Sequence, residues 1–260
     1  MQELKIVYKK KETIHRAPAA FDEMTREQFI LTAENILRSA IGSHDSDWYF
    51  CKMLGIDEKI WKKLPSFYCY SIRGLFEYTG ETEPPITKQL LPYIEINGQK
   101  YIGYQPGFSN TTWQEFIYAD QYILQRKYRE AAACLYRPQR ANYDGETDRR
   151  IPFTIYGVNN RLEFFKDIPE AEIFAFVLNY NALRKRNLEE KYPFVFGFRK
   201  EKEEEEEKKG SAPGTFSWVA IHREMMGDNF YDESKYFELG VQVVLHRLNS
   251  AIKENKSKKK

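Results

Sequence analysis

Local signatures of catalysis, metal binding and secretion are missing from this sequence. The three cysteines, Cys51, Cys69 and Cys134, are an odd number without CxxC spacing, so neither a disulfide framework nor a zinc site is indicated. No Walker loop, GxGxxG, GxSxG or HExxH motif occurs. We therefore expect a protein that is not an enzyme and uses no cofactor and no metal, although a triad assembled from distant residues would leave no such trace.

Long hydrophobic runs are also missing. No stretch approaches the roughly 20 apolar residues that span a bilayer, and the first residues, MQELKIVYKKK, lack the apolar segment of a signal peptide. Together with the cysteine pattern, this predicts a soluble cytoplasmic protein with no membrane partner.

The chain also has no strong net charge, since its formal net charge is only +2. Residues 253–260 hold five lysines and one glutamate, whereas residues 199–209 hold five basic and six acidic residues. The rest of the chain is close to neutral, which gives no long-range field that would gather nucleic acid. We therefore do not expect nucleic acid as the main partner, and we interpret the last lysines as a solubilising, disordered end.

Aromatic residues are what the chain has in quantity, with 18 Phe, 18 Tyr and four Trp in a composition that is 42% hydrophobic. This is enough to build a core in one large domain or two ordinary ones. Phenols and indoles are also common at protein interfaces, where they combine a large apolar area with one polar atom.

A charged run divides the sequence into parts. Residues 199–209 read RKEKEEEEEKK and are followed by GSAPG, a composition typical of a spacer that is either a stiff helix or a solvated coil. This predicts four segments, namely a body over 1–198, a linker over 199–214, a helical arm over 215–252 and a disordered basic tail over 253–260.

The body is predicted to be α+β and mainly helical, with two β-hairpins. Alternating apolar residues on both sides of a lysine-rich turn indicate the first hairpin, and the Asn97-Gly98 pair, which suits a type I′ turn, indicates the second. Capping-box pairs, Thr25 with Gln28 and Thr112 with Glu115, predict a helix after each hairpin, the first over about 25–41.

The two helical segments also repeat a pattern at a distance of 87 residues. The first set is Phe21, Thr25, Phe29, Ile30, Ile36 and Leu37, and the second is Phe108, Thr112, Phe116, Ile117, Ile123 and Leu124. This indicates either a duplicated β-β-α unit or two capped amphipathic helices that resemble each other by chance, and both interpretations stay open.

The arm is predicted to be a helical hairpin with one apolar stripe. We call these residues the C-terminal stripe and predict that they bind a partner: Trp218, Ile221, Met225, Val241, Val244, Leu245, Leu248 and Ile252. Two short helices bury too little surface to be stable alone, so the stripe must be covered. The cover is either the body of the same chain or a groove on another protein, and the sequence does not distinguish them.

Three polar clusters resemble fragments of known sites but have simpler structural explanations. His44 and Asp45 lack the further ligands of a metal-dependent hydrolase, so helix capping is favoured. The HRE triplet at 222–224 echoes a zinc deaminase motif without the PCxxC that should follow. The alternating polar residues of 142–148 lack the last glutamate of a calcium loop, which favours an exposed turn.

The order of parts resembles the tail assembly chaperones of tailed phages and prophages. The segments FSWVAIHREMMG at 216–227 and VVLHRL at 243–248 are similar to their second segment, and FDEMTREQF at 21–29 and YPFVF at 192–196 are similar to small proteins of gut-bacterial phages. The resemblance implies a non-enzymatic tail assembly protein in the host cytoplasm, with virion association as an option. It also implies a protein partner such as the tape measure protein, bound by the arm. Two alternatives are an oligomerising structural virion or adaptor protein and an accessory protein that binds single-stranded nucleic acid.

Overall fold

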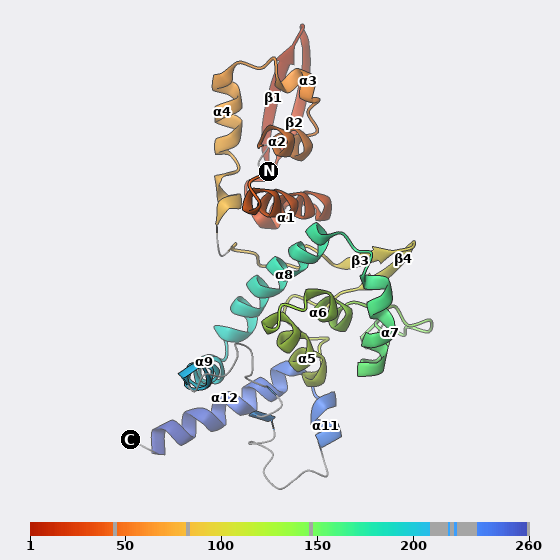
Figure 1. Ribbon diagram of the computed structural model, residues 1–260, viewed down its shortest axis with the longest axis vertical. Helices are drawn as coiled ribbons and strands as arrows, with labels where there is room; N and C mark the ends of the chain where they lie inside the picture. The colour runs from red at the N-terminus through yellow and green to blue at the C-terminus, as the bar shows by residue number, and fades with distance from the viewer. Residues whose placement is uncertain are drawn as a thin grey trace. The chain divides into compact units, whose positions relative to one another are not determined.

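The computed structural model describes residues 1–43, 46–81, 84–145, 148–208, 218, 221–222 and 233–258. The fold is α+β and mainly helical, with 58% helix, 13% strand and two small antiparallel sheets, which confirms the predicted fold class (Figure 1). The chain divides into two compact units, the first formed by Met1–Leu91 and Pro169–Ala182 and the second by Pro92–Ile168 and Leu183–Lys260. Within the described ranges, no helix is both long and apolar enough to cross a bilayer.

The first unit begins with the expected hairpin and continues as short helices. Its elements are β1 (Gln2–Tyr8), β2 (Lys11–Ala17), the 3₁₀ turn η1 (Phe21–Glu23), α1 (Arg26–Ala40), α2 (Ser46–Leu54), α3 (Glu58–Trp61), α4 (Ser66–Gly74), the 3₁₀ turn η2 (Glu77–Gly80) and most of α8 (Glu170–Arg184). The Asn179 side chain on α8 accepts from the Leu90 N–H and donates to the Lys88 carbonyl, both at 3.1 Å. These bonds satisfy backbone groups of an irregular segment and hold α8 in the first unit.

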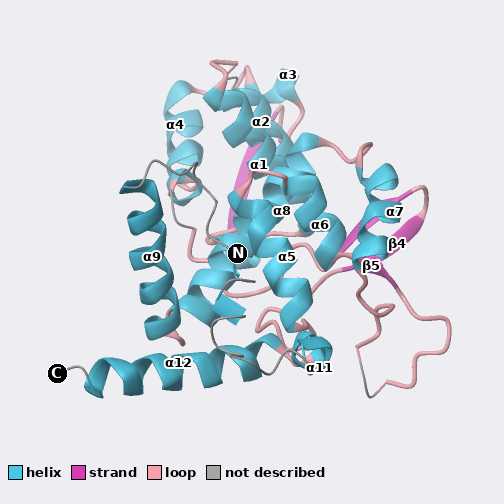
Figure 2. Cartoon of the chain, turned by 60° about the horizontal axis from the view of Figure 1, so that its bottom comes forward, coloured by secondary structure: helices cyan, strands magenta, loops and turns pink. Residues whose placement is uncertain are grey.

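The second unit contains the other hairpin and the C-terminal helices. Its elements are β3 (Tyr93–Ile96), β4 (Gln99–Ile102), α5 (Trp113–Leu124), α6 (Tyr128–Leu135), β5 (Arg137–Pro138), α7 (Ile155–Phe165), the π-helical turn η3 (Lys185–Glu189), α9 (Pro193–Lys208), α11 (Glu233–Glu238) and α12 (Val241–Lys258). The sheet order is β3-β4-β5. Helix α12 contacts both α9 and α5, while α11 contacts α5 (Figure 2).

The predicted helix starts are correct, because capping is a local property. The Thr25 hydroxyl accepts from the Gln28 N–H at 3.2 Å, and the Gln28 side chain accepts from the Thr25 N–H at 3.0 Å. At the second helix, the Thr112 hydroxyl accepts from the Glu115 N–H at 3.2 Å. Here the box is incomplete, since the Glu115 carboxylate binds two arginines instead.

The pattern repeated at 87 residues has a structural counterpart. Phe21 and Phe29 are buried edge-to-face with ring centres 6.3 Å apart and an interplanar angle of 84°. Phe108 and Phe116 are also buried edge-to-face, at 6.4 Å and 86°. Each pair joins the turn after a hairpin to the helix that follows, so the two β-β-α segments share their local packing as well as their residues.

Helix α9 runs through the predicted boundary after residue 198 and continues to Lys208. Glu and Lys are good helix formers, and no breaking residue interrupts the run before Gly210. The stiff-helix alternative therefore holds over 199–208, and the rest of the predicted linker lies outside the described residues. The arm is not a separate segment either, since its described helices belong to the second compact unit.

The tail predicted to be disordered over 253–260 is helical as far as Lys258. Its residues extend α12 without a helix breaker, and Lys256 forms an ion pair of 2.8 Å with Glu201 on α9. The two charged runs are far apart in the sequence, but the fold brings α9 and α12 together so that opposite charges on them form an ion pair.

Candidate functional site

The C-terminal stripe lies inside the second unit. Trp218 is 1% exposed, and the other fully buried members are Ile221, Val241, Val244, Leu245 and Leu248. Ile252 is half-buried, and Met225 lies outside the described residues. The chain therefore covers most of the stripe with its own residues, which is the first of the two alternatives left by the sequence.

Asp120 on α5 anchors this packing. Its carboxylate accepts the indole N–H of Trp218 at 2.6 Å and pairs with Arg199 at 2.9 Å and with Arg184 at 2.6 Å. The ring of Trp218 also meets the rings of Trp113 and Phe116, in both cases with centres 5.6 Å apart. A buried charge with several polar partners fixes Trp218 in one orientation.

His222, the first residue of the HRE triplet, has a packing role. Its Nδ1 accepts the indole N–H of Trp113 at 3.1 Å, and its ring stacks on Phe237 with centres 4.8 Å apart. A ring nitrogen that accepts this bond is not free to bind zinc. Among the residues that the structure describes, no group of three or more His, Cys, Asp or Glu side chains is placed to hold a metal ion.

A buried ion network joins α5 to the segment around β5. Glu115 pairs with Arg137 at 2.9 Å and with Arg150 at 2.8 Å, and Asp148 pairs with the same two arginines at 3.1 and 2.9 Å. Burial raises the pKa of Glu115 while Arg150 and Arg137 oppose that shift, and burial lowers the pKa of Arg137 to about 10. The network fills every carboxylate oxygen of Glu115 with arginine donors, so it stabilises the fold and offers no free base.

Sequence reasoning missed this network because its members are far apart along the chain. Asp148 was expected in an exposed calcium-like turn, and the structure corrects this, since Arg137 and Arg150 take up its carboxylate. The other weak candidates, His44 and Asp45, lie outside the described residues.

The thiols of Cys69 and Cys134 are not activated as nucleophiles. Burial raises the pKa of the Cys134 thiol and that of the half-buried Cys69 thiol, so both stay protonated at neutral pH. A thiol in this state is a poor nucleophile and a poor metal ligand.

An exposed aromatic surface lies on α4 in the first unit. We call Phe67, Tyr68 and Tyr70 the α4 aromatic face; they are 75%, 57% and 75% exposed. Phe67 and Tyr70 are three residues apart and therefore share one side of the helix. Only Ile72 of this nine-residue helix is buried. The sequence predicts a helix here but gives no sign that its aromatic residues point outward.

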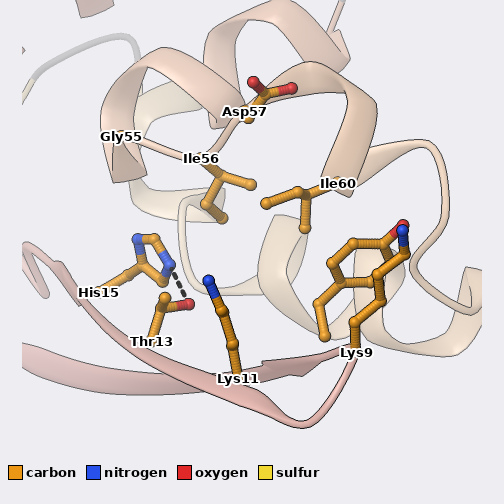
Figure 3. A pocket seen from close by; sticks show the side chains of 9 residues that line it. Lys9, Lys11, Thr13, His15, Gly55, Ile56, Asp57 and Ile60 are labelled. Atoms are coloured by element: carbon orange, nitrogen blue, oxygen red, sulfur yellow. Dashed lines mark hydrogen bonds between the residues drawn. The ribbon is translucent and has the colours of Figure 1, made fainter.

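The first unit also contains an open cavity of about 620 Å³ beside the first hairpin (Figure 3). We call it the hairpin pocket. It is lined by Tyr8, Lys9, Lys11, Thr13, His15, Gly55, Ile56, Asp57 and Ile60. The first hairpin therefore supplies the cationic groups together with Thr13 and His15, whereas Ile56 and Asp57 come just before α3 and Ile60 lies within it.

Hydrogen bonds fix the polar wall of the hairpin pocket. The His15 Nδ1 lies 2.8 Å from the Leu54 carbonyl, and since a carbonyl only accepts, this nitrogen carries a proton. The His15 Nε2 shares a hydrogen bond of 2.9 Å with the Thr13 hydroxyl. The ring is therefore held between β2 and the end of α2, beside Thr13 at one side of the pocket (Figure 3).

Comparison of the chain with protein-family models, curated proteins and solved structures finds no match. The surfaces described above therefore carry the functional argument.

Proposed function

We propose that this chain is a non-enzymatic assembly protein that binds a protein partner through the α4 aromatic face. The observation that carries the proposal is the exposure of three large aromatic side chains on one nine-residue helix. Aromatic residues supply most of the affinity in many protein interfaces, because each buries a large area at a small cost in side-chain entropy.

The α4 aromatic face is unusual for a surface that binds no partner. Phe67 and Tyr70 leave most of their area in water, although burying such a ring is worth about 2 kcal/mol or more. Single exposed apolar residues are common on proteins, but a group of aromatic rings on one helix is typical of a binding surface.

The finer proposal is a role in the assembly of phage tails, with the tape measure protein as the partner. It rests on the resemblance of residues 216–227 and 243–248 to tail assembly chaperones. The sequence predicts that the C-terminal stripe binds the partner. We propose α4 as the contact surface instead, because the chain itself covers most of the stripe.

A second candidate function is self-assembly as a structural virion or adaptor protein. The same aromatic face favours it, because a helix face that pairs with its own copy forms a symmetric dimer. Light scattering at rising protein concentration separates the two: a monomer at all concentrations supports a different partner, whereas a concentration-dependent dimer supports self-assembly.

The test is a matched pair of double variants. Phe67→Ser with Tyr70→Ser removes the centre of the α4 aromatic face, while Tyr156→Ser with Phe164→Ser removes two exposed aromatics from α7. In co-purification with the tape measure protein of the same genome, the first variant should bind at least tenfold more weakly. The second should bind like the unmodified protein. Equal binding by both variants contradicts the proposal.

A further inference from the structure

We propose that the hairpin pocket binds a nucleoside phosphate, with lysines at the hairpin tip holding the phosphate and the apolar wall receiving the base. This site is separate from the α4 aromatic face. Three observations support it: the dimensions and lining of the cavity, the lack of carboxylate partners for its lysines among the residues that the structure describes, and the backbone conformation of the hairpin turn.

The dimensions favour a ligand larger than a simple ion. A volume of about 620 Å³ lies within the usual range of small-molecule sites and far exceeds the space that one phosphate fills. Ile56 and Ile60 form an apolar wall opposite Lys11, whose ammonium group points into the hollow (Figure 3). A ligand with one flat apolar part and one anionic part matches such a lining.

Lys9 and Lys11 in the pocket and Lys63 beside Tyr8 have no anionic partner among the described residues. No ion pair of Lys9, Lys11 or Lys63 is found with any residue that the structure describes, whereas on the same hairpin Lys5 pairs with Glu12 at 2.8 Å. Lys9 and Lys63 each place their ammonium group 5.7 Å from the ring centre of Tyr8. Like charges thus gather around one ring, and an anion bound between them would relieve their repulsion.

The only carboxylate of the lining is otherwise engaged. Asp57 caps α3 by accepting the Lys59 backbone N–H at 2.7 Å, and its side chain points away from Lys11 (Figure 3). The polar groups that remain available to a ligand are therefore Lys9, Lys11 and the Thr13–His15 pair. Their charge favours a phosphate over a cation.

The hairpin turn gives independent support. Tyr8 pairs with Lys11, so Lys9 and Lys10 form a two-residue turn with φ values of 46° and 65°. The second hairpin makes the same type of turn with Asn97 and Gly98, at 52° and 76°, and these residue types adopt positive φ most readily. The first hairpin therefore keeps two lysines where the backbone disfavours them, which is a known property of functional positions.

The nucleobase assignment follows from what surrounds the phosphate-binding groups. The Tyr8 ring and the two isoleucines offer an apolar surface next to the ammonium groups, and Thr13 with His15 offers hydrogen bonds at its edge. A nucleotide presents three matching features, namely a flat apolar ring, polar atoms at the edge of that ring and an anionic phosphate. The nucleotide can be free or part of a single strand, since both present this chemistry.

The test uses the full-length protein and isothermal titration at low salt with four probes: adenosine monophosphate, a short single-stranded oligonucleotide, inorganic phosphate and an oligoglutamate peptide. We expect binding of the monophosphate or the oligonucleotide, and which of the two is tighter tells whether the natural ligand is free or polymeric. Equal or tighter binding of inorganic phosphate or oligoglutamate, or no binding of either nucleotide probe, overturns the proposal.

Variants locate the binding and separate it from stability. Lys9→Asn with Lys10→Gly should weaken nucleotide binding about tenfold while raising the melting temperature by roughly 2–4 °C, because the turn is relaxed. Lys11→Gln should weaken binding by a similar factor. Lys5→Gln, which alters a paired lysine of the same hairpin, should leave it unchanged. Unchanged binding in both the turn variant and Lys11→Gln would place the ligand elsewhere and refute the site.

Discussion

Trp218 donates its indole N–H to the Asp120 carboxylate on α5 at 2.6 Å, which ties the C-terminal part of the chain to the centre of the second unit. Arg184 and Arg199 pair with the same carboxylate, so three segments that are far apart in the sequence meet at one buried charge. The apolar stripe around Trp218 therefore completes the core of the second unit.

Trp218→Ala should destabilise the second unit by about 3–5 kcal/mol, because it opens a large cavity and leaves Asp120 with one donor fewer. Urea unfolding followed by circular dichroism measures the change. Val243→Ala is the control, since Val243 is exposed on α12 and should change the free energy of unfolding by less than about 0.5 kcal/mol. Equal effects of the two substitutions would contradict the internal docking of the stripe.

Removal of residues 241–260 should unfold much of the second unit and leave the first unit folded. The deletion exposes the surfaces of α5 and α9 that α12 covers, whereas every described residue of the first unit lies outside the deleted range. Hydrogen exchange read by mass spectrometry distinguishes the units. Protection that persists over 113–135 after the deletion would show that α12 is dispensable for the fold.

Glu115→Gln should cost about 3–5 kcal/mol, because two arginines, both buried, lose their shared counter-charge. The matched control is Gln28→Ala, at the equivalent position of the repeated pattern, where an exposed capping bond and a long bond of 3.4 Å to the Met53 carbonyl are lost and the cost should be about 1 kcal/mol. Thermal unfolding of the two variants gives the comparison. A Glu115→Gln variant as stable as the control would mean that the network is energetically neutral.

The first unit should lose stability in alkaline solution. Burial raises the pKa of the Tyr49 phenol, and burial followed by the Tyr49 and Glu23 charges raises that of Tyr78. The folded state then keeps protons that the unfolded state releases near pH 10, so the contribution of these two phenols to stability is constant below pH 10 and falls above it. The limiting slope is about 1.4 kcal/mol per pH unit for each phenol.

Tyr49→Phe isolates one of these two groups. The variant should show a shallower loss of stability above pH 10, and ultraviolet absorbance should detect fewer phenols that ionise only on unfolding. An unchanged slope would show that Tyr49 ionises equally in both states.

The parts of the fold that local chemistry determines were predictable from the sequence. Asn97-Gly98 and the threonine caps at Thr25 and Thr112 specify turns and helix starts through bonds within a few residues, and all of them are present. The buried network was not predictable, because Glu115 meets Arg137 and Arg150 only through the tertiary fold and no sequence spacing marks the contact.

Composition does not reveal where a residue lies in the fold. The charged run at 199–209 was interpreted as a boundary, yet Glu and Lys favour helix and continue α9. The exposure of the aromatic residues of α4 was not predictable, since composition does not reveal which side of a helix faces water. Conversely, the stripe at Val241–Leu248 was correctly recognised as a surface that needs cover, but the pattern does not tell an internal cover from an external one.

Hydrogen exchange of the full-length protein, with and without the tape measure protein of the same genome, tests the central claim most directly. The account predicts that the partner adds protection over Ser66–Gly74, where the α4 aromatic face lies, while α12 is protected equally in both states. New protection confined to Val241–Lys258, with α4 unchanged, would contradict it and return the partner contact to the C-terminal stripe.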